Sequence, residues 1–270
     1  MNRKLNIVLL FFLLAGSVKG QADTSFKLIK TISGDIIAFT ADNLDNIYLL
    51  NSTNQIKKLN ANGDSVAVFN NVKKYGQASL IDVSNPMRVL LYYKDFATIV
   101  ILDRFLNIRS TIDLRRQNIL QVRAICQSYD NKIWVYDEFE SKLKKIDEDG
   151  TLLFETSDFR QLFGTAPLPQ RIFDQDLYVY LYDSAQSVFV FDYYGALKNK
   201  IQIAGWQNFK VTGKYIFGSG NNTLYRYDIK TFRTDEWKLP DEIARAKAFN
   251  FSGNRIYALR KDSLDIFNFR

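Results

Sequence analysis

The fold of this chain can be deduced from one short stretch, Asp45-Asn46-Ile47-Tyr48-Leu49-Leu50, because its pattern recurs along the sequence. Two polar turn residues precede a run of β-branched, aromatic and aliphatic residues, as expected where a turn leads into a half-buried strand. Six such runs begin 42, 44, 44, 38 and 41 residues apart: Ile47–Leu50, Val89–Tyr92, Ile133–Tyr136, Leu177–Tyr180, Tyr215–Phe217 and Ile256–Leu259. A period of about 40 residues is typical of repeat architectures.

Three further strands are predicted in most of these units. A second apolar run follows each of the first at the same step: Ile56–Leu59, Ile99–Leu102, Leu143–Ile146, Val188–Phe191, Leu224–Tyr227 and Leu264–Phe267. Asn62-Gly63, Asp149-Gly150 and Gly195 then indicate tight hairpins into a fourth strand, because Gly, Asn and Asp accept a positive φ. Units two, five and six lack this glycine, so their turns must be built differently. A strand such as Ile36–Thr40 also precedes each first run.

The two ends of the chain complete each other. The sixth unit reaches Arg270 after only three strands, whereas Phe26–Ile32 is a strand without a unit of its own. We therefore predict an all-β fold, a six-bladed β-propeller over residues 21–270 with four antiparallel strands per blade. The N-terminal strand would supply the outer strand of the last blade and remove an open edge.

The D/N-x-I-Y-like runs, such as Asp45–Tyr48 and Asp130–Trp134, carry a resemblance to a known family. Together with the Asn-Gly and Asp-Gly turns, they resemble the six-bladed NHL-like and TolB-like propellers over residues 26–270. The resemblance implies a fold and no particular activity. WD40 propellers are disfavoured because Gly-His and Trp-Asp pairs do not recur at blade spacing, and kelch propellers because paired glycines do not. A β-sandwich would leave the regular period unexplained.

The first 20 residues have the pattern of an export signal. Arg3 and Lys4 precede an apolar run, Leu5–Leu14, and small residues follow over Ala15–Gly20. We predict that residues 1–20 are a signal peptide and that the mature protein is periplasmic or outer-membrane-associated. The apolar run is shorter than the roughly 20 residues that span a bilayer, so no transmembrane segment is expected after cleavage, although an uncleaved anchor is the alternative.

Composition limits the possible chemistry. The sequence contains no histidine, which removes the commonest general base and the commonest transition-metal ligand. Its single cysteine, Cys126, cannot form an internal disulfide and is interpreted as a packed core residue. Without Arg3, Lys4 and Lys19 the formal charge falls from +7 to +4, and the basic residues are scattered. We expect no catalytic residues, no cofactor, no resident metal and no nucleic-acid partner.

Two acidic runs could suggest a cation site. Asp147-Glu148-Asp149-Gly150 is interpreted as a hairpin turn instead, because the same place in the first unit reads Asn60-Ala61-Asn62-Gly63. Asp137, Glu138 and Glu140 are interpreted as a solvated loop, with a partner contact as the alternative.

Calcium-dependent lactonases with six blades hold their ion on the central axis through acidic and amide side chains of the inner strands. The corresponding strands here offer Asp82, Asp174 and Asn250. They also offer basic residues, which oppose a cation and could hold an anion on the axis. The basic candidates are Arg123, Arg171, Lys210 and Lys247.

A partner-binding face is predicted where the links between blades lie. Aromatic, apolar and arginine residues close together are typical of protein interfaces. The candidates are Lys73, Lys74, Arg115, Arg116, Arg160, Leu162, Phe163 and Trp206. The alternative is that Leu162 and Phe163 pack into the edge of a blade.

These observations favour a non-catalytic protein-interaction module of a Gram-negative envelope, a subunit of an outer-membrane-associated assembly. The abundance of Asn, Lys, Tyr, Phe and Ile suggests Bacteroidota. The triplets Asp64-Ser65-Val66, Asp183-Ser184-Ala185 and Asp262-Ser263-Leu264 resemble the O-glycosylation signal of that phylum. The alternatives are a calcium-dependent lactonase-like hydrolase and a propeller that binds a small anion or sugar on its axis.

Overall fold

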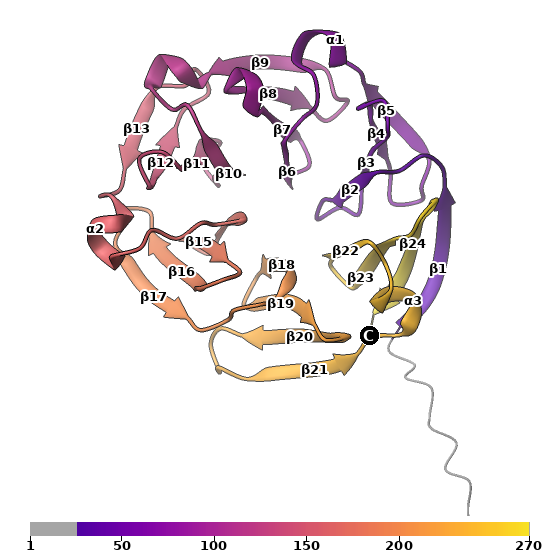
Figure 1. Cartoon of the computed structure of the whole chain (residues 1–270). Coiled ribbons are helices and arrows are strands. Elements are labelled where there is room, and N and C mark those ends of the chain that lie inside the picture. Colours follow the sequence, from indigo (N-terminus) through magenta and orange to yellow (C-terminus); the bar gives the residue numbers. More distant parts are fainter. Residues whose placement is uncertain (1–25, 270) are drawn as a thin grey trace, which may run out of the picture.

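The computed structural model of the protein describes residues 26–269 and confirms a six-bladed β-propeller. Six antiparallel sheets of four strands each stand around a common axis (Figure 1). In the first five blades the chain runs from the inner strand outward before it passes to the next blade, whereas the outer strand of the sixth is β1. The predicted signal peptide, residues 1–20, lies outside the described residues.

The first three blades follow one another along the chain. Blade 1 consists of β2 (Ala38–Ala41), β3 (Ile47–Leu50), β4 (Ile56–Leu59) and β5 (Ser65–Phe69). Blade 2 consists of β6 (Leu80–Asn85), β7 (Arg88–Tyr93), β8 (Thr98–Asp103) and β9 (Ile108–Asp113). Blade 3 consists of β10 (Val122–Gln127), β11 (Ile133–Asp137), β12 (Lys142–Ile146) and β13 (Leu152–Glu155).

The remaining blades complete the ring. Blade 4 consists of β14 (Arg171–Gln175), β15 (Tyr178–Asp183), β16 (Ser187–Asp192) and β17 (Leu197–Ile201). Blade 5 consists of β18 (Gln207–Thr212), β19 (Tyr215–Gly220), β20 (Thr223–Asp228) and β21 (Thr234–Lys238). Blade 6 consists of β22 (Ala248–Ser252), β23 (Arg255–Leu259), β24 (Ser263–Phe269) and the N-terminal strand β1 (Phe26–Ser33).

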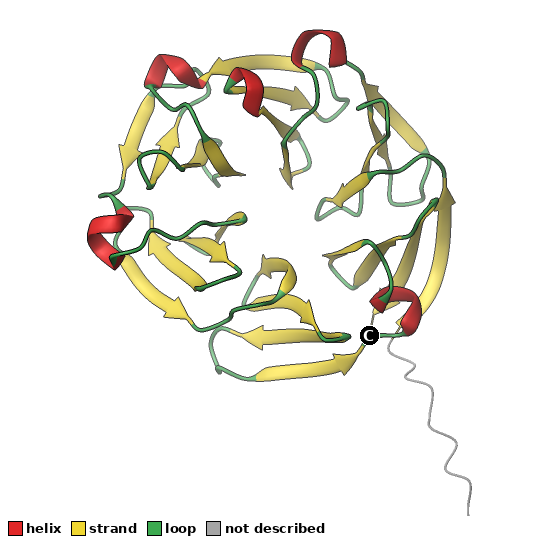
Figure 2. Cartoon of the chain, viewed as in Figure 1, coloured by secondary structure: helices red, strands yellow, loops and turns green. Residues whose placement is uncertain are grey.

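Short helices interrupt the loops at the periphery of the ring (Figure 2). They are α1 (Val72–Tyr75), η1 (Lys94–Phe96), η2 (Leu114–Gln117), α2 (Phe159–Phe163) and α3 (Asp241–Ala244). Within residues 26–269, no helix has the length and apolar character that a membrane span requires.

The two ends of the chain close the ring, as predicted. β1 pairs with β24 in antiparallel register, with Phe26 opposite Phe269 and Ser33 opposite Ser263. The rings of Phe26 and Phe269 stack with centroids 5.1 Å apart. Thr31 Oγ1 donates a hydrogen bond to Asp265 Oδ1 at 2.7 Å. The last blade therefore has no strand missing.

The hydrophobic core lies between neighbouring blades. All residues of β7 and β11 are buried, because the second strand of each blade is covered on both sides. One apolar cluster joins Leu90 and Ile101 of blade 2 to Ile133 and Val135 of blade 3. Each blade thus buries its faces against two others, which removes the apolar surface from water.

The turns between third and fourth strands share one geometry in blades 1 to 4, so the prediction that blade 2 builds its turn differently is wrong. Asp147 Oδ1 accepts hydrogen bonds from the backbone N–H of Asp149 and Thr151, so the acidic run at 147–150 is a hairpin turn. Gly150 has φ of 88°, which glycine adopts without strain. In blade 2, which lacks the glycine, Leu106 takes the same position with φ of 62°.

Tyrosines on second strands tie blades together. The Tyr136 hydroxyl donates to the Pro167 carbonyl and the Tyr182 hydroxyl to the Trp206 carbonyl, both in the chain that enters the next blade. The Tyr92 hydroxyl accepts from the Val122 N–H at 3.4 Å. Because Tyr136 is fully buried, its hydroxyl has no alternative partner in water.

We expect Tyr136→Phe to lower the free energy of unfolding by about 1–2 kcal/mol, since the Pro167 carbonyl would remain unpaired. Urea denaturation followed by tryptophan fluorescence measures this change. Tyr194→Phe is the matched control, because Tyr194 is 88% exposed, and it should unfold like the wild type. Equal stability of the two variants would contradict the assigned role of Tyr136.

Candidate functional site

One face of the ring carries the links from the outer strand of each blade to the inner strand of the next, and we call it the connector face. The turns between second and third strands lie on the same face. A hydrogen bond from the Glu138 N–H to the Gln121 carbonyl, at 2.9 Å, joins such a turn to the link before blade 3. The helices α1, η2, α2 and α3 all belong to these links.

The basic residues that were predicted to bind a partner lie on the connector face. Lys73 and Lys74 are exposed on α1. Arg115 and Arg116 are exposed on η2, and Arg115 pairs with Asp113 at 2.8 Å. These four residues lie at the links after blades 1 and 2.

Arg160 and the three hydrophobic candidates have different environments. Arg160 pairs with Asp158 at 2.6 Å, and this hydrogen bond lowers the pKa of Asp158. Leu162 is 52% exposed. Its neighbour Phe163 packs inward, with its ring centroid 5.1 Å from that of Phe189. Trp206 is partly buried and stacks on Tyr225 at 4.9 Å.

Three exposed apolar side chains gather around blade 3 on this face, and we call them the blade-3 patch. Leu120 is 57% exposed, Phe139 is 70% exposed and Leu162 is 52% exposed. They come from separate loops that are bonded together. Gln121 Nε2 donates to Glu138 Oε2 at 2.9 Å, and Arg160 Nη2 donates to the Glu140 carbonyl at 3.4 Å. The three loops that carry these side chains are therefore neighbours in space although they are distant in the sequence.

A buried ion pair holds the turn that presents Phe139. Lys144 Nζ lies 2.8 Å from Asp137 Oδ2 and 2.8 Å from Glu140 Oε2. Asp137 Oδ1 also accepts hydrogen bonds from the N–H groups of Phe139 and Glu140. Burial alone would lower the pKa of Lys144, but the hydrogen bonds to Asp137 and Glu140 raise it overall.

The interpretation of residues 137–140 as a solvated loop is wrong for Asp137. Its side chain is fully buried, and Glu138 pairs with Arg123 at 2.9 Å instead of extending freely into water. The acidic side chains of residues 137–140 pair with basic residues of the protein, and Phe139 is the residue of this turn that faces outward. An aromatic residue within a charged turn was the available signal in the sequence.

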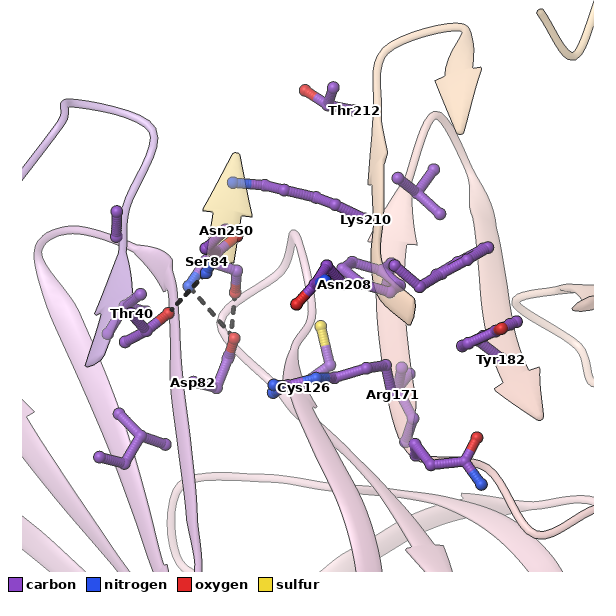
Figure 3. A pocket seen from close by; sticks show the side chains of 18 of the residues that line it. Thr40, Asp82, Ser84, Cys126, Arg171, Tyr182, Asn208, Lys210, Thr212 and Asn250 are labelled. Atoms are coloured by element: carbon purple, nitrogen blue, oxygen red, sulfur yellow. Dashed lines mark hydrogen bonds between the residues drawn. The ribbon is translucent and has the colours of Figure 1, made fainter. Parts of the chain in front are cut away.

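A cavity of about 530 Å³ occupies the axis of the ring. All six inner strands contribute to its wall, through residues that include Thr40, Asp82, Cys126, Arg171, Lys210 and Asn250 (Figure 3). Arg171 and Lys210 are thus brought together in one cavity. Arg123, which pairs with Glu138, and Lys247, which is exposed, do not line it.

The carboxylates of the cavity wall are bonded to protein donors. Asp174 accepts from Ser128 Oγ at 2.8 Å, Trp134 Nε1 at 2.9 Å and the Tyr193 hydroxyl. Asp82 Oδ2 accepts from the Gln127 N–H at 2.7 Å. Within residues 26–269, no three acidic or cysteine side chains converge as ligands of one metal ion would.

Cys126 lies in the cavity wall but is buried and donates to the Gln127 carbonyl. Burial raises the pKa of its thiol, and the charges of Asp82 and Asp174 raise it further. The thiolate, which is the nucleophilic form, is therefore disfavoured at neutral pH.

Comparisons with known proteins identify the fold and no family. No protein-family model matches the chain, and no curated protein is significantly similar to it. Among solved structures, virginiamycin B lyase from Staphylococcus aureus is 14% identical with a TM-score of 0.61, over 91% of this chain and 100% of the lyase. A Bacteroides fragilis protein described as exported is 9% identical with a TM-score of 0.61, over 92% and 96% of the two chains.

A WD40 domain from Neurospora crassa is also similar, at 11% identity and a TM-score of 0.59, over 86% of this chain and 78% of the domain. At such low identities the likeness is one of fold. Enzymes and non-enzymatic repeat domains both appear among these proteins, so the shared architecture does not decide the function.

We expect Lys144→Met to lower the free energy of unfolding by about 3–5 kcal/mol, because Asp137 would remain buried without its cation. Chemical denaturation measures the loss. Lys142→Met is the matched control, since Lys142 pairs with Glu155 at the surface and should contribute at most about 1 kcal/mol. A loss below that of the control would refute the role of the buried pair.

Lys210 should titrate near neutral pH. Burial lowers its pKa from 10.5 to about 8, against the opposing charges of Asp42 and Asp45. Because the native pKa lies below the unfolded value, the native state binds fewer protons, and this residue's contribution to stability rises with pH between about 8 and 10.5. NMR of ¹³C-methylated lysines, assigned with Lys210→Arg, measures the pKa. Lys198, whose pKa is raised by Asp192, should titrate above 10.5 and serves as the control.

Proposed function

We propose that the protein is an exported, non-catalytic protein-interaction module of the bacterial envelope, a subunit of an outer-membrane-associated assembly. The observation that carries this proposal is the blade-3 patch. Three separate loops each place an apolar side chain in solvent at the same corner of the ring, and Arg160 lies beside them.

The chemistry of the patch suits a protein partner. An aromatic side chain with arginines nearby is the composition that interface centres favour. The buried pair of Asp137 and Lys144 fixes the turn of Phe139, so little conformational entropy would be lost when a partner docks. Leu120, Phe139 and Leu162 would enter pockets of the partner, and Arg116 and Arg160 would form the polar rim.

Export is supported by the pattern of residues 1–20, in which a basic start precedes a short apolar run and small residues. One protein of the same fold, from Bacteroides fragilis, is described as exported too. Periplasmic or outer-membrane association follows as the place where such a module would meet its partners.

An enzymatic role has less support. A histidine-to-alanine variant of the Staphylococcus aureus lyase is described as catalytically inactive, and the present sequence contains no histidine. A lactonase-like calcium site would need open carboxylates on the axis. Asp174, the best placed of them, is bonded to three side-chain donors.

The proposal predicts that Phe139→Asp abolishes capture of the partner from envelope extracts. A charge at the centre of an apolar interface cannot be desolvated without a large cost, so retention should fall by at least about tenfold. Affinity purification with quantitative mass spectrometry measures it. A photo-crosslinking amino acid at position 139 should additionally join the protein to one discrete envelope protein.

Phe105→Asp is the matched control. Phe105 is 50% exposed, but it lies in the turn between β8 and β9, on the face opposite the connector face. Capture should be unaffected by this variant. Equal loss with both variants, or no discrete crosslink at position 139, would overturn the proposed interface.

A further inference from the structure

The axial cavity contains a cation without an anionic partner. Arg171 begins β14, and its side chain extends across the cavity toward Asp82 of β6 (Figure 3). It forms no hydrogen bond or ion pair with any other described residue. Solvent reaches Arg171 through the cavity, yet enough protein surrounds it that desolvation lowers its pKa. An anionic ligand in the cavity would form charge-assisted hydrogen bonds with this guanidinium.

Other basic residues show that the fold can supply such partners. Arg123, in the equivalent strand of blade 3, is 2.9 Å from Glu138. Arg88 pairs with Glu148 at 2.9 Å. Lys210, the second cation of the cavity, donates to the Phe251 carbonyl. Arg171 differs from these three residues, because its side chain has no hydrogen-bond or ion-pair partner among the described residues.

Asp82 supplies an acceptor opposite Arg171. Its Oδ2 accepts from the Gln127 N–H and from Ser84 Oγ, whereas Oδ1 has only a long hydrogen bond of 3.2 Å from the Ser84 N–H. Burial raises the pKa of Asp82, and the charge of Arg171 lowers it. Both groups line the cavity and no ion pair joins them, so each can contact a ligand in it.

This pairing constrains the ligand. A group that lies between a guanidinium and a carboxylate must accept from one and donate to the other. An anion with acceptors alone, such as sulfate, would be repelled by Asp82. A carboxylate with a neighbouring hydroxyl satisfies both sides.

The rest of the cavity agrees with a small, polar ligand. Its volume of about 530 Å³ lies within the range of small-molecule sites, about 300–1,000 Å³. Thr212 and Asn250 add polar groups to the wall, and Asn250 Nδ2 is only weakly engaged, at 3.4 Å from Thr40 Oγ1. The other carboxylates in the cavity wall repel a bound anion less, because protein groups already donate hydrogen bonds to them. Asp174 is bonded as described above, and Asp42 accepts from the Tyr48 hydroxyl and the Asn46 side chain.

We propose that the axial cavity binds a small hydroxylated carboxylate, such as a sugar acid, with its carboxylate on Arg171 and a hydroxyl on Asp82. This site is separate from the blade-3 patch and does not depend on the interaction proposed there. Lys210 and Asn250 would contact the remaining hydroxyls. The ligand would be held by the inner strands of several blades at once.

Isothermal titration calorimetry of the purified protein with D-glucuronate tests the proposal. We expect saturable binding that Arg171→Gln weakens by at least about tenfold, since it removes a charge-assisted hydrogen-bonded pair. D-glucose, which lacks the carboxylate, and acetate, which lacks the hydroxyls, should each bind at least about tenfold more weakly than glucuronate. Asp82→Asn should reduce the preference for glucuronate over acetate.

Arg123→Gln is the matched control, because it removes a basic residue of an inner strand outside the cavity. It should bind glucuronate like the wild type. Asp82 also holds the Gln127 N–H, so the melting temperature of each variant is measured first, and Arg171→Gln carries the test if Asp82→Asn does not fold. Absence of glucuronate binding, equal binding by Arg171→Gln, or tighter binding of sulfate than of glucuronate would each overturn the proposal.

Discussion

The pairing of β1 with β24 is the interaction on which the rest of the structure depends, because the sixth sheet is built from both ends of the chain. Each blade buries its two faces against neighbouring blades, so a blade that lacks its outer strand weakens the packing on both of its sides. The axial cavity has the same requirement. Its wall includes residues of all six inner strands, and the cavity keeps its shape only while the ring is closed.

Basic side chains act largely as links within this ring. Lys58 donates to the Arg104 carbonyl of the next blade at 2.9 Å, and Arg255 of blade 6 donates to the Ala61 carbonyl of blade 1 at 3.1 Å. Lys210 connects blades 5 and 6 in the same way. Some of the lysine and arginine side chains thus form hydrogen bonds between blades. Against this background an unpaired Arg171 is informative.

The fold could be predicted because it is repeated: six copies of the same apolar pattern are harder to explain by chance than any single strand. The directions of side chains were harder to predict, because an error of one residue in a strand boundary places every side chain on the other face of the sheet. A β-bulge between Val122 and Ala124 lies where Arg123 is found, and Arg123 pairs with Glu138 away from the cavity. On the short helix α2, Leu162 is exposed to solvent whereas the adjacent Phe163 packs against Phe189. The sequence signal for Phe139, an aromatic residue in a charged turn, was weak, because its exposure depends on a buried ion pair that the sequence does not reveal.

The closure of the ring also sets an order of events during biosynthesis. β1 is among the first folded segments to be made, yet the strand that it pairs with ends at Phe269. At a translation rate of about 5–20 residues per second, roughly 10–50 s separate the two. Throughout that interval the residues of β1 lack the strand with which they will pair, and an unpaired strand is prone to aggregation. A nascent chain of this kind therefore needs protection, by a chaperone or by a narrow translocation channel, until its last strand emerges.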